Sequence, residues 1–442
     1  MALRNLLLRL AFGGLLAAVG FVMARRKLPA QLTAWTDWEF DRIFFTFYAV
    51  SHFLLFFVAF FLLHQKPWAD LIGFYVPQAH AVMQGQVPNR DFLSSYAPLN
   101  PYLDAFLLRM HDSPLTILVF QIICDLLSVP FWIRFLRRFM NETTVRKAAL
   151  LYLLQPLVVW EICLDGKNQG MISLLLGIAF WAVARREILS GISFSLTWIL
   201  VKILPVMFLP TLFIGARKRL RWLLAALLPS LIVYGAFVLV GADVTAGLRK
   251  ENTIATPQNL PYLFGTLTGV DVPRIVLSLL SVAVILAVLF VTIRAQLDAK
   301  TEAAKLWKMA LGAEFVLLVM MLINKKSDTS YLAMCFFLLS AFVAFEADRG
   351  RWTMLWFYLL LSFIGLPIVS FWYWPLKRQP ATQIHAMSLA GDRNALIMVA
   401  MQTLLAVGYL GLAAGILRLL RVPAADSAPS EDEAQLVRDS VS

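Results

Sequence analysis

The sequence has 442 residues, of which 60% are hydrophobic and only 15% are charged, and its net charge is +12. Soluble domains are about 45–50% apolar and about 25% charged, so a water-soluble fold of this length could not bury so many apolar residues. The composition excludes a soluble enzyme and predicts an all-α polytopic integral membrane protein. The excess of Lys and Arg is attributed to loops that face anionic lipid headgroups, not to nucleic-acid binding.

About 11 spanning helices are expected, because a helix that crosses the bilayer core needs about 20 mostly apolar residues. Segment 6–23 resembles a signal peptide, but basic residues follow it without a cleavage pattern, so a retained helix is preferred to a cleaved or interfacial segment. The predicted spans are 6–23, 43–63, 115–134, 147–163, 171–184 (shorter than the rest), 221–241, 275–294, 309–324, 330–346, 353–373 and 396–417.

The basic loops orient the bundle, because short loops rich in Lys and Arg are cytoplasmic. The basic clusters at 185–186 and 217–221 are both predicted to be cytoplasmic, although only the apolar stretch 190–214 separates them. We therefore predict that 190–214 is a re-entrant hairpin whose tip lies near Lys202 and Pro205. Broken helices at membrane depth are tolerated only where they are buried in protein or line a cavity, so this break marks a candidate site.

This orientation gives one transmembrane domain, 1–421, with a cytoplasmic C-terminus. The tail 422–442 contains Pro423, Pro429 and an acidic run, and it is predicted to be disordered. The outward segments are then 64–114, 164–170, 242–274, 325–329 and 374–395.

The first outward loop, 64–114, is long for a structureless connection and is expected to contain helices. Residues 72–84 have an amphipathic helical pattern that Gly85 can end, and residues 101–110 form a second short helix with Asn100 as its N-cap. Both helices are expected to lie flat on the outer membrane surface.

Two stretches of sequence carry a resemblance to a known family. In the first loop the order is Asp70, the amphipathic helix ending at Gly85, the stretch Pro88 to Phe92, and then Tyr96-Ala-Pro-Leu. In 165–213 the order is DGKNQG, an apolar run, Arg185-Arg186, Ser190-Gly191, Lys202 and Pro205. This ordered set resembles the GT-C superfamily of membrane glycosyltransferases, most closely its bacterial polyprenol-phosphate mannosyltransferase branch.

The resemblance covers the N-terminal half well. In the C-terminal half, NKKSDTSYL (324–332) is similar to a late outward loop of the family. The chain departs from the family pattern at Ala97, where many relatives have a second Pro, and at Lys167 within the Gly–Gln element.

The resemblance implies a GT-C-like helical bundle that acts as a hexosyltransferase at the outer face of the cytoplasmic membrane, in cell-envelope glycan biosynthesis. The donor would be a polyprenyl-phosphate sugar, with mannose favoured, and the acceptor a hydroxyl of a lipid or glycan. No cofactor beyond this donor substrate and no divalent metal are implied. The expected partners are the donor, the acceptor and membrane lipids, with no nucleic acid.

Asp70 is the predicted catalytic residue, since transfer to a hydroxyl needs a general base and Asp70 matches the family's catalytic Asp. The alternative is that Asp70 only caps the helix over 72–84. Asp91 is a second acidic candidate, for acceptor binding, and its alternative is a solvated turn residue beside Arg90. Tyr96 and Gln169 are candidates for acceptor or sugar binding, and Gln169 could instead belong to a simple turn.

Arg90, Lys202, Lys325 and Lys326 are candidates for binding the donor phosphate, since Lys and Arg compensate such an anion. Lys202 is the most informative, because an ionisable residue within a transmembrane stretch is a functional hypothesis by default. Its alternatives are an ion pair with Asp125 and a side chain that extends to the interface. Lys325 and Lys326 could instead anchor the chain at the interface.

Two other functions are compatible with many spans and a basic inward face. One is a transporter or flippase for a lipid-linked saccharide, and the other is a non-catalytic scaffold of an envelope-assembly complex. The long first loop with Asp70 favours the transferase, because transport does not require it. The sequence shows no internal repeat of the kind that transporters with inverted halves have.

Overall fold

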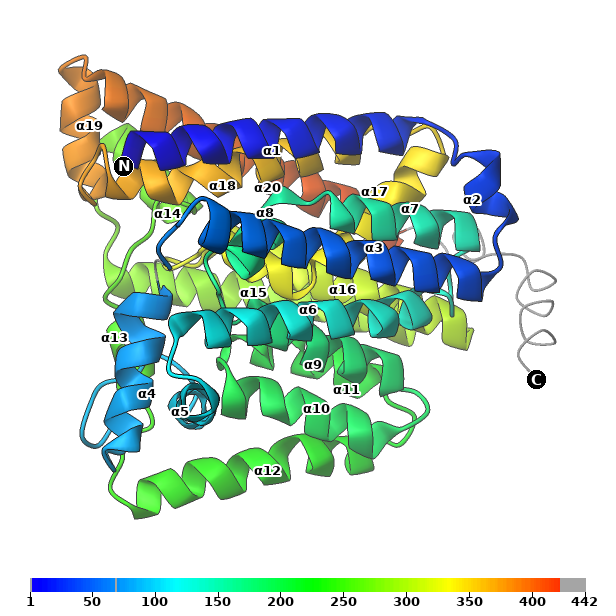
Figure 1. Cartoon of the computed structure of the whole chain (residues 1–442), viewed down its shortest axis with the longest axis horizontal. Helices are drawn as coiled ribbons and strands as arrows, with labels where there is room; N and C mark the ends of the chain where they lie inside the picture. Colours follow the sequence, from blue (N-terminus) through cyan, green and yellow to red (C-terminus); the bar gives the residue numbers. More distant parts are fainter. Residues whose placement is uncertain (1, 68–69, 422–442) are drawn as a thin grey trace.

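The computed structural model describes residues 2–67 and 70–421 of the chain, with the side chains of the first few residues left aside. Helices make up the fold, and none of these residues forms a β-strand beyond the isolated bridge between Pro88 and Phe92. The long helices lie side by side, while α4, α5, α13, α14 and α19 gather at one end (Figure 1). We call this the loop-rich end. The predicted tail 422–442 lies outside the described residues.

Eight helices of the described chain are long and apolar enough to cross a membrane, which makes this a multi-pass membrane protein. Helix α16 is buried on all sides, whereas α12 and α15 expose most of their leucine and valine side chains, as lipid-facing helices do. The eight are α1 (Ala2–Arg25), α3 (Asp37–Phe57) extended by η1 (Val58–Leu62), α6 (Pro114–Leu136), α12 (Arg219–Leu239), α15 (Arg274–Leu297), α16 (Glu302–Ile323), α18 (Thr353–Tyr373) and α20 (Arg393–Arg421).

The other three predicted spans are shorter or broken. Residues 147–163 divide into α7 (Glu142–Leu153) and α8 (Pro156–Cys163), because Pro156 has no N–H for a continuous helix. Residues 171–184 form α9 (Gln169–Ala182), and residues 330–346 divide into the 3₁₀ turn η4 (Thr329–Met334) and α17 (Phe336–Asp348). The expected number of about 11 therefore exceeds the eight full-length spans by these three segments.

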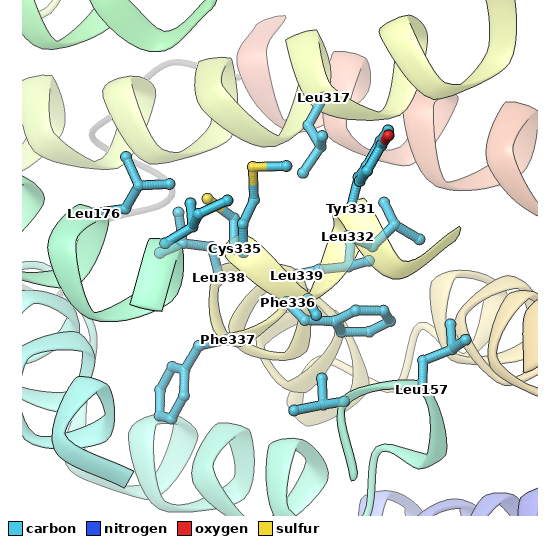
Figure 2. Packing of buried hydrophobic residues seen from close by; sticks show 14 of the residues in the cluster. Leu157, Leu176, Leu317, Tyr331, Leu332, Cys335, Phe336, Phe337, Leu338 and Leu339 are labelled. Atoms are coloured by element: carbon cyan, nitrogen blue, oxygen red, sulfur yellow. The ribbon is translucent and has the colours of Figure 1, made fainter. Parts of the chain in front are cut away.

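The broken segment η4–α17 lies at the centre of the bundle. Figure 2 shows Phe336 and Phe337 among side chains from α16, α8 and α9, such as Leu317, Leu157 and Leu176. All of these side chains are fully buried. This packing fixes the position of η4, whose first residues face the loop-rich end.

Residues 187–215 form a hairpin made of α10 (Glu187–Leu200), η3 (Leu204–Phe208) and α11 (Leu209–Gly215). Helix α10 packs parallel to α12: near their beginnings a Cβ on Gly191 would be 2.6 Å from the carbonyl oxygen of Trp222, and near their ends Tyr234 Oη donates to the carbonyl of Trp198. Gly191 is required at this close approach. Both ends of the hairpin thus lie at the end of the bundle opposite to Lys202.

The membrane sidedness of this hairpin can be measured. Single cysteines at the exposed positions Arg186 and Lys218 should both react with a membrane-impermeant thiol reagent only from the cytoplasmic side. A cysteine at the exposed Lys377 should react only from the outside. The native residues Cys124, Cys163 and Cys335 are buried and give little background. Labelling of positions 186 and 218 from opposite sides would show that 190–214 crosses the membrane once.

The first loop forms the predicted pair of helices. One is the π-helical turn η2 (Leu71–Tyr75) with α4 (Val76–Met83), followed by Gly85 at φ +83°, where glycine is favoured. The other is α5 (Asn100–Met110), which begins one residue before the predicted 101–110. Asn100 is not its N-cap, since Leu99 holds that position and Asn100 is buried inside the helix.

The short helices that complete the connections are α2 (Ala30–Ala34), at the opposite end of the bundle, and α13 (Ala246–Glu251), α14 (Leu260–Thr268) and α19 (Ala381–Leu389), at the loop-rich end (Figure 1).

Candidate functional site

Segments far apart in the sequence meet at the loop-rich end. The backbone N–H of Ala97 donates to the carbonyl of Val201 at 3.1 Å, and the N–H of Leu99 donates to Ile199 at the same distance, which joins the first loop to the hairpin tip. The N–H of Thr256 donates to the carbonyl of Lys325 at 3.2 Å. The first two bonds hold Tyr96 near Lys202, and the third holds the segment 324–331 against Thr256.

Lys202 lies in the turn between α10 and η3 and is half-buried. Its Nζ atom is 5.1 Å from the ring centroid of Tyr96 and 5.1 Å from that of Tyr331. Rings at this distance stabilise an ammonium ion but do not neutralise it. Burial lowers the pKa of Lys202, and the Asp70 carboxylate is the largest charge that opposes this. Within the described chain Lys202 forms no salt bridge.

Asp70 precedes η2 but does not cap it. Its backbone is helical, and its side chain accepts no capping hydrogen bond from the helix that follows. The alternative in which Asp70 is only a cap is therefore wrong. The residue is half-buried and forms no salt bridge with any residue the structure describes. Its carboxylate interacts electrostatically with Lys202, Tyr96 and Tyr331.

Lys167 occupies the centre of a buried group of charges beside Lys202. Its Nζ atom is 2.7 Å from Glu161 Oε2 and 3.2 Å from Asp328 Oδ2. Burial alone would lower the pKa of Lys167, but Asp328 and Glu161 hold it well above its usual value. Burial raises the pKa of Asp328, yet Lys167 and Ser330 overcome this and lower it to about 2. Both groups are therefore ionised at neutral pH.

Gln169 is fully buried, and its Nε2 donates to Ser330 Oγ at 3.2 Å. Among the described residues its Oε1 has no hydrogen-bond partner, and neither side-chain polar atom of the neighbouring Asn168 has one. Such buried polar atoms are rare unless water or a ligand satisfies them. The turn 165–170 thus offers unsatisfied hydrogen-bonding groups suited to a polar ligand.

Arg90 and Asp91 pair with each other instead of entering this cluster. Arg90 Nη2 is 2.8 Å from Asp91 Oδ2, and Asp91 also accepts from the N–H of Val87 at 2.7 Å. The side chains are partly exposed in a turn closed by the bridge between Pro88 and Phe92. The structure therefore places the two residues as a turn pair at the loop surface.

Lys325 and Lys326 are at the edge of the site with partners of their own. Lys326 pairs with Glu251 of α13, and Lys325 Nζ donates to the carbonyl of Asn252. Burial, together with the nearby ammonium of Lys202, lowers the pKa of Lys326 to about 8. Lys202 is therefore the candidate cation best placed to meet an additional anion.

The ion pair with Asp125, one of the alternatives for Lys202, is wrong. Asp125 is fully buried in α6 and accepts hydrogen bonds from the hydroxyls of Tyr48 and Tyr152, the latter at 2.7 Å. Phenolic hydroxyls satisfy its two oxygens without a positive charge.

Several residues of this site were not identified from the sequence. Tyr331 and Asp328 lie in the segment 324–332, which resembles the family as a whole without pointing to either residue. Glu161 lies inside the predicted span 147–163. Arg9, inside the predicted span 6–23, forms a salt bridge with Asp165 at 2.8 Å. Among the described residues no group of three or more His, Cys, Asp or Glu side chains is placed to hold a metal ion.

Comparison of the chain with protein-family models, with curated proteins and with solved structures gives no match.

Proposed function

We propose that this protein is a membrane glycosyltransferase that moves a hexose from a polyprenyl-phosphate donor to a hydroxyl of a lipid or glycan at the outer membrane face. The observation that carries the proposal is the pair Asp70 and Lys202. The Asp70 carboxylate and the Lys202 ammonium lie at the loop-rich end of the helical bundle, and neither forms a salt bridge with a described residue. The resemblance to GT-C enzymes supports the same assignment.

In the proposed reaction Asp70 accepts the proton of the acceptor hydroxyl as its oxygen bonds to the anomeric carbon. The bond between that carbon and the phosphate oxygen breaks, and its electron pair stays on the phosphate. Lys202, between Tyr96 and Tyr331, donates to the phosphate whose charge increases. Gln169 and Asn168 supply buried polar atoms for sugar hydroxyls, and a mannose donor remains the preferred choice.

The membrane position agrees with this chemistry. A polyprenyl chain stays in the bilayer while its phosphate lies at the interface, and Lys202 lies in the turn between the end of α10 and the start of η3. The basic connections 185–186 and 217–221 are at the opposite end, and short basic loops are typically cytoplasmic, which supports a site at the outer face of the cytoplasmic membrane.

The direct test uses the purified protein in nanodiscs with a panel of polyprenyl-phosphate hexoses and lipid or glycan acceptors. The expected result is a new glycoside together with free polyprenyl phosphate, detected by mass spectrometry. A donor that changes leaflet in proteoliposomes without any bond breaking would support the flippase instead.

The pH dependence of donor binding gives a second test. Because burial lowers the pKa of Lys202, its ammonium should lose its proton at a lower pH than an ordinary lysine. Donor affinity should therefore weaken as pH rises, beginning below the usual lysine pKa of about 10.4. Titration of donor affinity measures this, and Lys202→Arg should remove the alkaline loss. A wild-type curve that stays flat to that pH would contradict the role of Lys202.

A further inference from the structure

Among the described residues of the candidate site, Lys202 is a cation without a salt bridge, and three carboxylates interact with its charge. Besides Asp70, these are the buried Glu161 and the half-buried Asp328. The ammonium of a lysine is carried on a flexible stem of four carbons and pairs readily with any carboxylate it reaches. Without some constraint, Lys202 would be neutralised by a residue of the protein itself.

Lys167 contacts two of these carboxylates in the structure. It spans Glu161 and Asp328, so that one ammonium occupies both carboxylates. The Lys167 N–H also donates to the carbonyl of Glu161 at 2.9 Å, which closes the turn that holds the lysine in place. Lys167 is itself buried.

Residues next to this group of charges have partners of their own. Arg9 of α1 pairs with Asp165 at 2.8 Å, and its guanidinium lies 4.8 Å from the ring of Trp160. Asp328 accepts from the N–H of Ser330 at 3.0 Å and so fixes the start of η4, which carries Tyr331. Asp165 is thus occupied by Arg9, which leaves Lys167 to the other two carboxylates.

We propose that Lys167 is a positioning residue that occupies Glu161 and Asp328 and thereby keeps Lys202 available for the phosphate of the donor. This inference rests on the proposed function. It gives a role to the one charged residue of the DGKNQG turn that departs from the family pattern. Lys167 itself does not contact the phosphate, since both of its anionic partners are already within the protein.

The test compares a matched pair of variants that differ by one negative charge next to Lys202. Both variants carry Lys167→Met and Glu161→Gln. One keeps the native Asp328, and the other also carries Asp328→Asn. The amide retains the oxygen that caps η4, so the local backbone is kept in both proteins. The probe is farnesyl phosphate, whose affinity for detergent-solubilised full-length protein is measured by calorimetry.

With Asp328 present, Lys202 should pair with it, and probe affinity should fall about tenfold or more, the factor expected for one charge-assisted hydrogen bond. With Asp328→Asn added, the affinity for the probe should return to within about threefold of wild type. A remaining difference of about that size is close to the amount by which the effects of separate substitutions usually depart from additivity. The pH dependence of probe binding should also return to that of wild type in the variant with Asp328→Asn. A purely structural role of Lys167 would not alter this pH dependence.

Three outcomes would decide the matter otherwise. Loss of binding in the variant that carries Asp328→Asn, with thermal stability retained, would mean that Lys167 contacts the phosphate and would overturn the proposal. Equal affinity with Asp or Asn at position 328 would overturn it as well. If the wild type itself does not bind the probe, the proposed function fails first, and this result is distinct from either of the others. Should the variant that keeps Asp328 not fold, the variant that carries Asp328→Asn still tests the proposal against wild type: affinity within about threefold supports it, and lost binding overturns it.

Discussion

Asp70→Asn is expected to reduce the rate of sugar transfer by about 10²–10⁴-fold, the usual contribution of a general base. The amide has nearly the same shape as the carboxylate but cannot accept the proton of the acceptor hydroxyl. Stability should be unchanged, because the Asp70 side chain caps no helix and forms no salt bridge with the described residues. Single-turnover transfer with purified protein in nanodiscs measures the rate, and thermal unfolding in detergent measures stability.

The matched control for this variant is Asp112→Asn in the same loop. The Asp112 carboxylate is 74% exposed and lies 3.1 Å from His80 Nε2, away from Lys202. Its replacement should leave transfer within a factor of about two, as surface substitutions usually change stability by no more than about 0.5 kcal/mol. Near-normal turnover of Asp70→Asn would remove Asp70 from the catalytic role.

The spans that the sequence predicts best are those with long, uninterrupted apolar runs. Segments 221–241 and 275–294 correspond to α12 and α15, which lie mostly against lipid, so composition alone determines them. Segment 330–346 is as apolar, but it is broken at Cys335 and lies in the centre of the bundle. Hydropathy cannot distinguish these cases, because a buried helix and a lipid-facing helix need the same residues.

The site was predictable where a single residue carried the signal. Lys202 stands out because charged residues are rare within apolar spanning stretches, and Asp70 stands out through the resemblance of the first loop. Their surroundings were not predictable, because Lys167 and Asp328 are separated by 161 positions and only the tertiary fold brings them together. The partner of Asp125 was missed for a different reason: a buried carboxylate needs hydrogen-bond donors, and tyrosine hydroxyls can replace a cation.

Lys202→Met should weaken donor binding and lower turnover strongly, while the thermal stability of the protein changes little. The ammonium lies beside two tyrosine rings and forms no salt bridge with a described residue, so its removal breaks no ion pair among them. Hydrogen bonds to charged groups contribute about 1.5–3 kcal/mol, which corresponds to a loss of donor affinity of about 10–150-fold. Calorimetry with farnesyl phosphate measures the affinity, and Lys377→Met, at an exposed lysine of the same end, is the control.

A double variant separates this role from an ion pair inside the membrane. Asp125→Leu should destabilise the protein by itself, since the hydroxyls of Tyr48 and Tyr152 lose their acceptor and each unsatisfied buried group costs about 1–3 kcal/mol. Adding Lys202→Met should not restore stability, because the two residues share no contact and their effects should add. Recovery of both stability and transfer in the double variant would instead mean that Asp125 and Lys202 are paired, and Lys202 would then be unavailable to the donor phosphate.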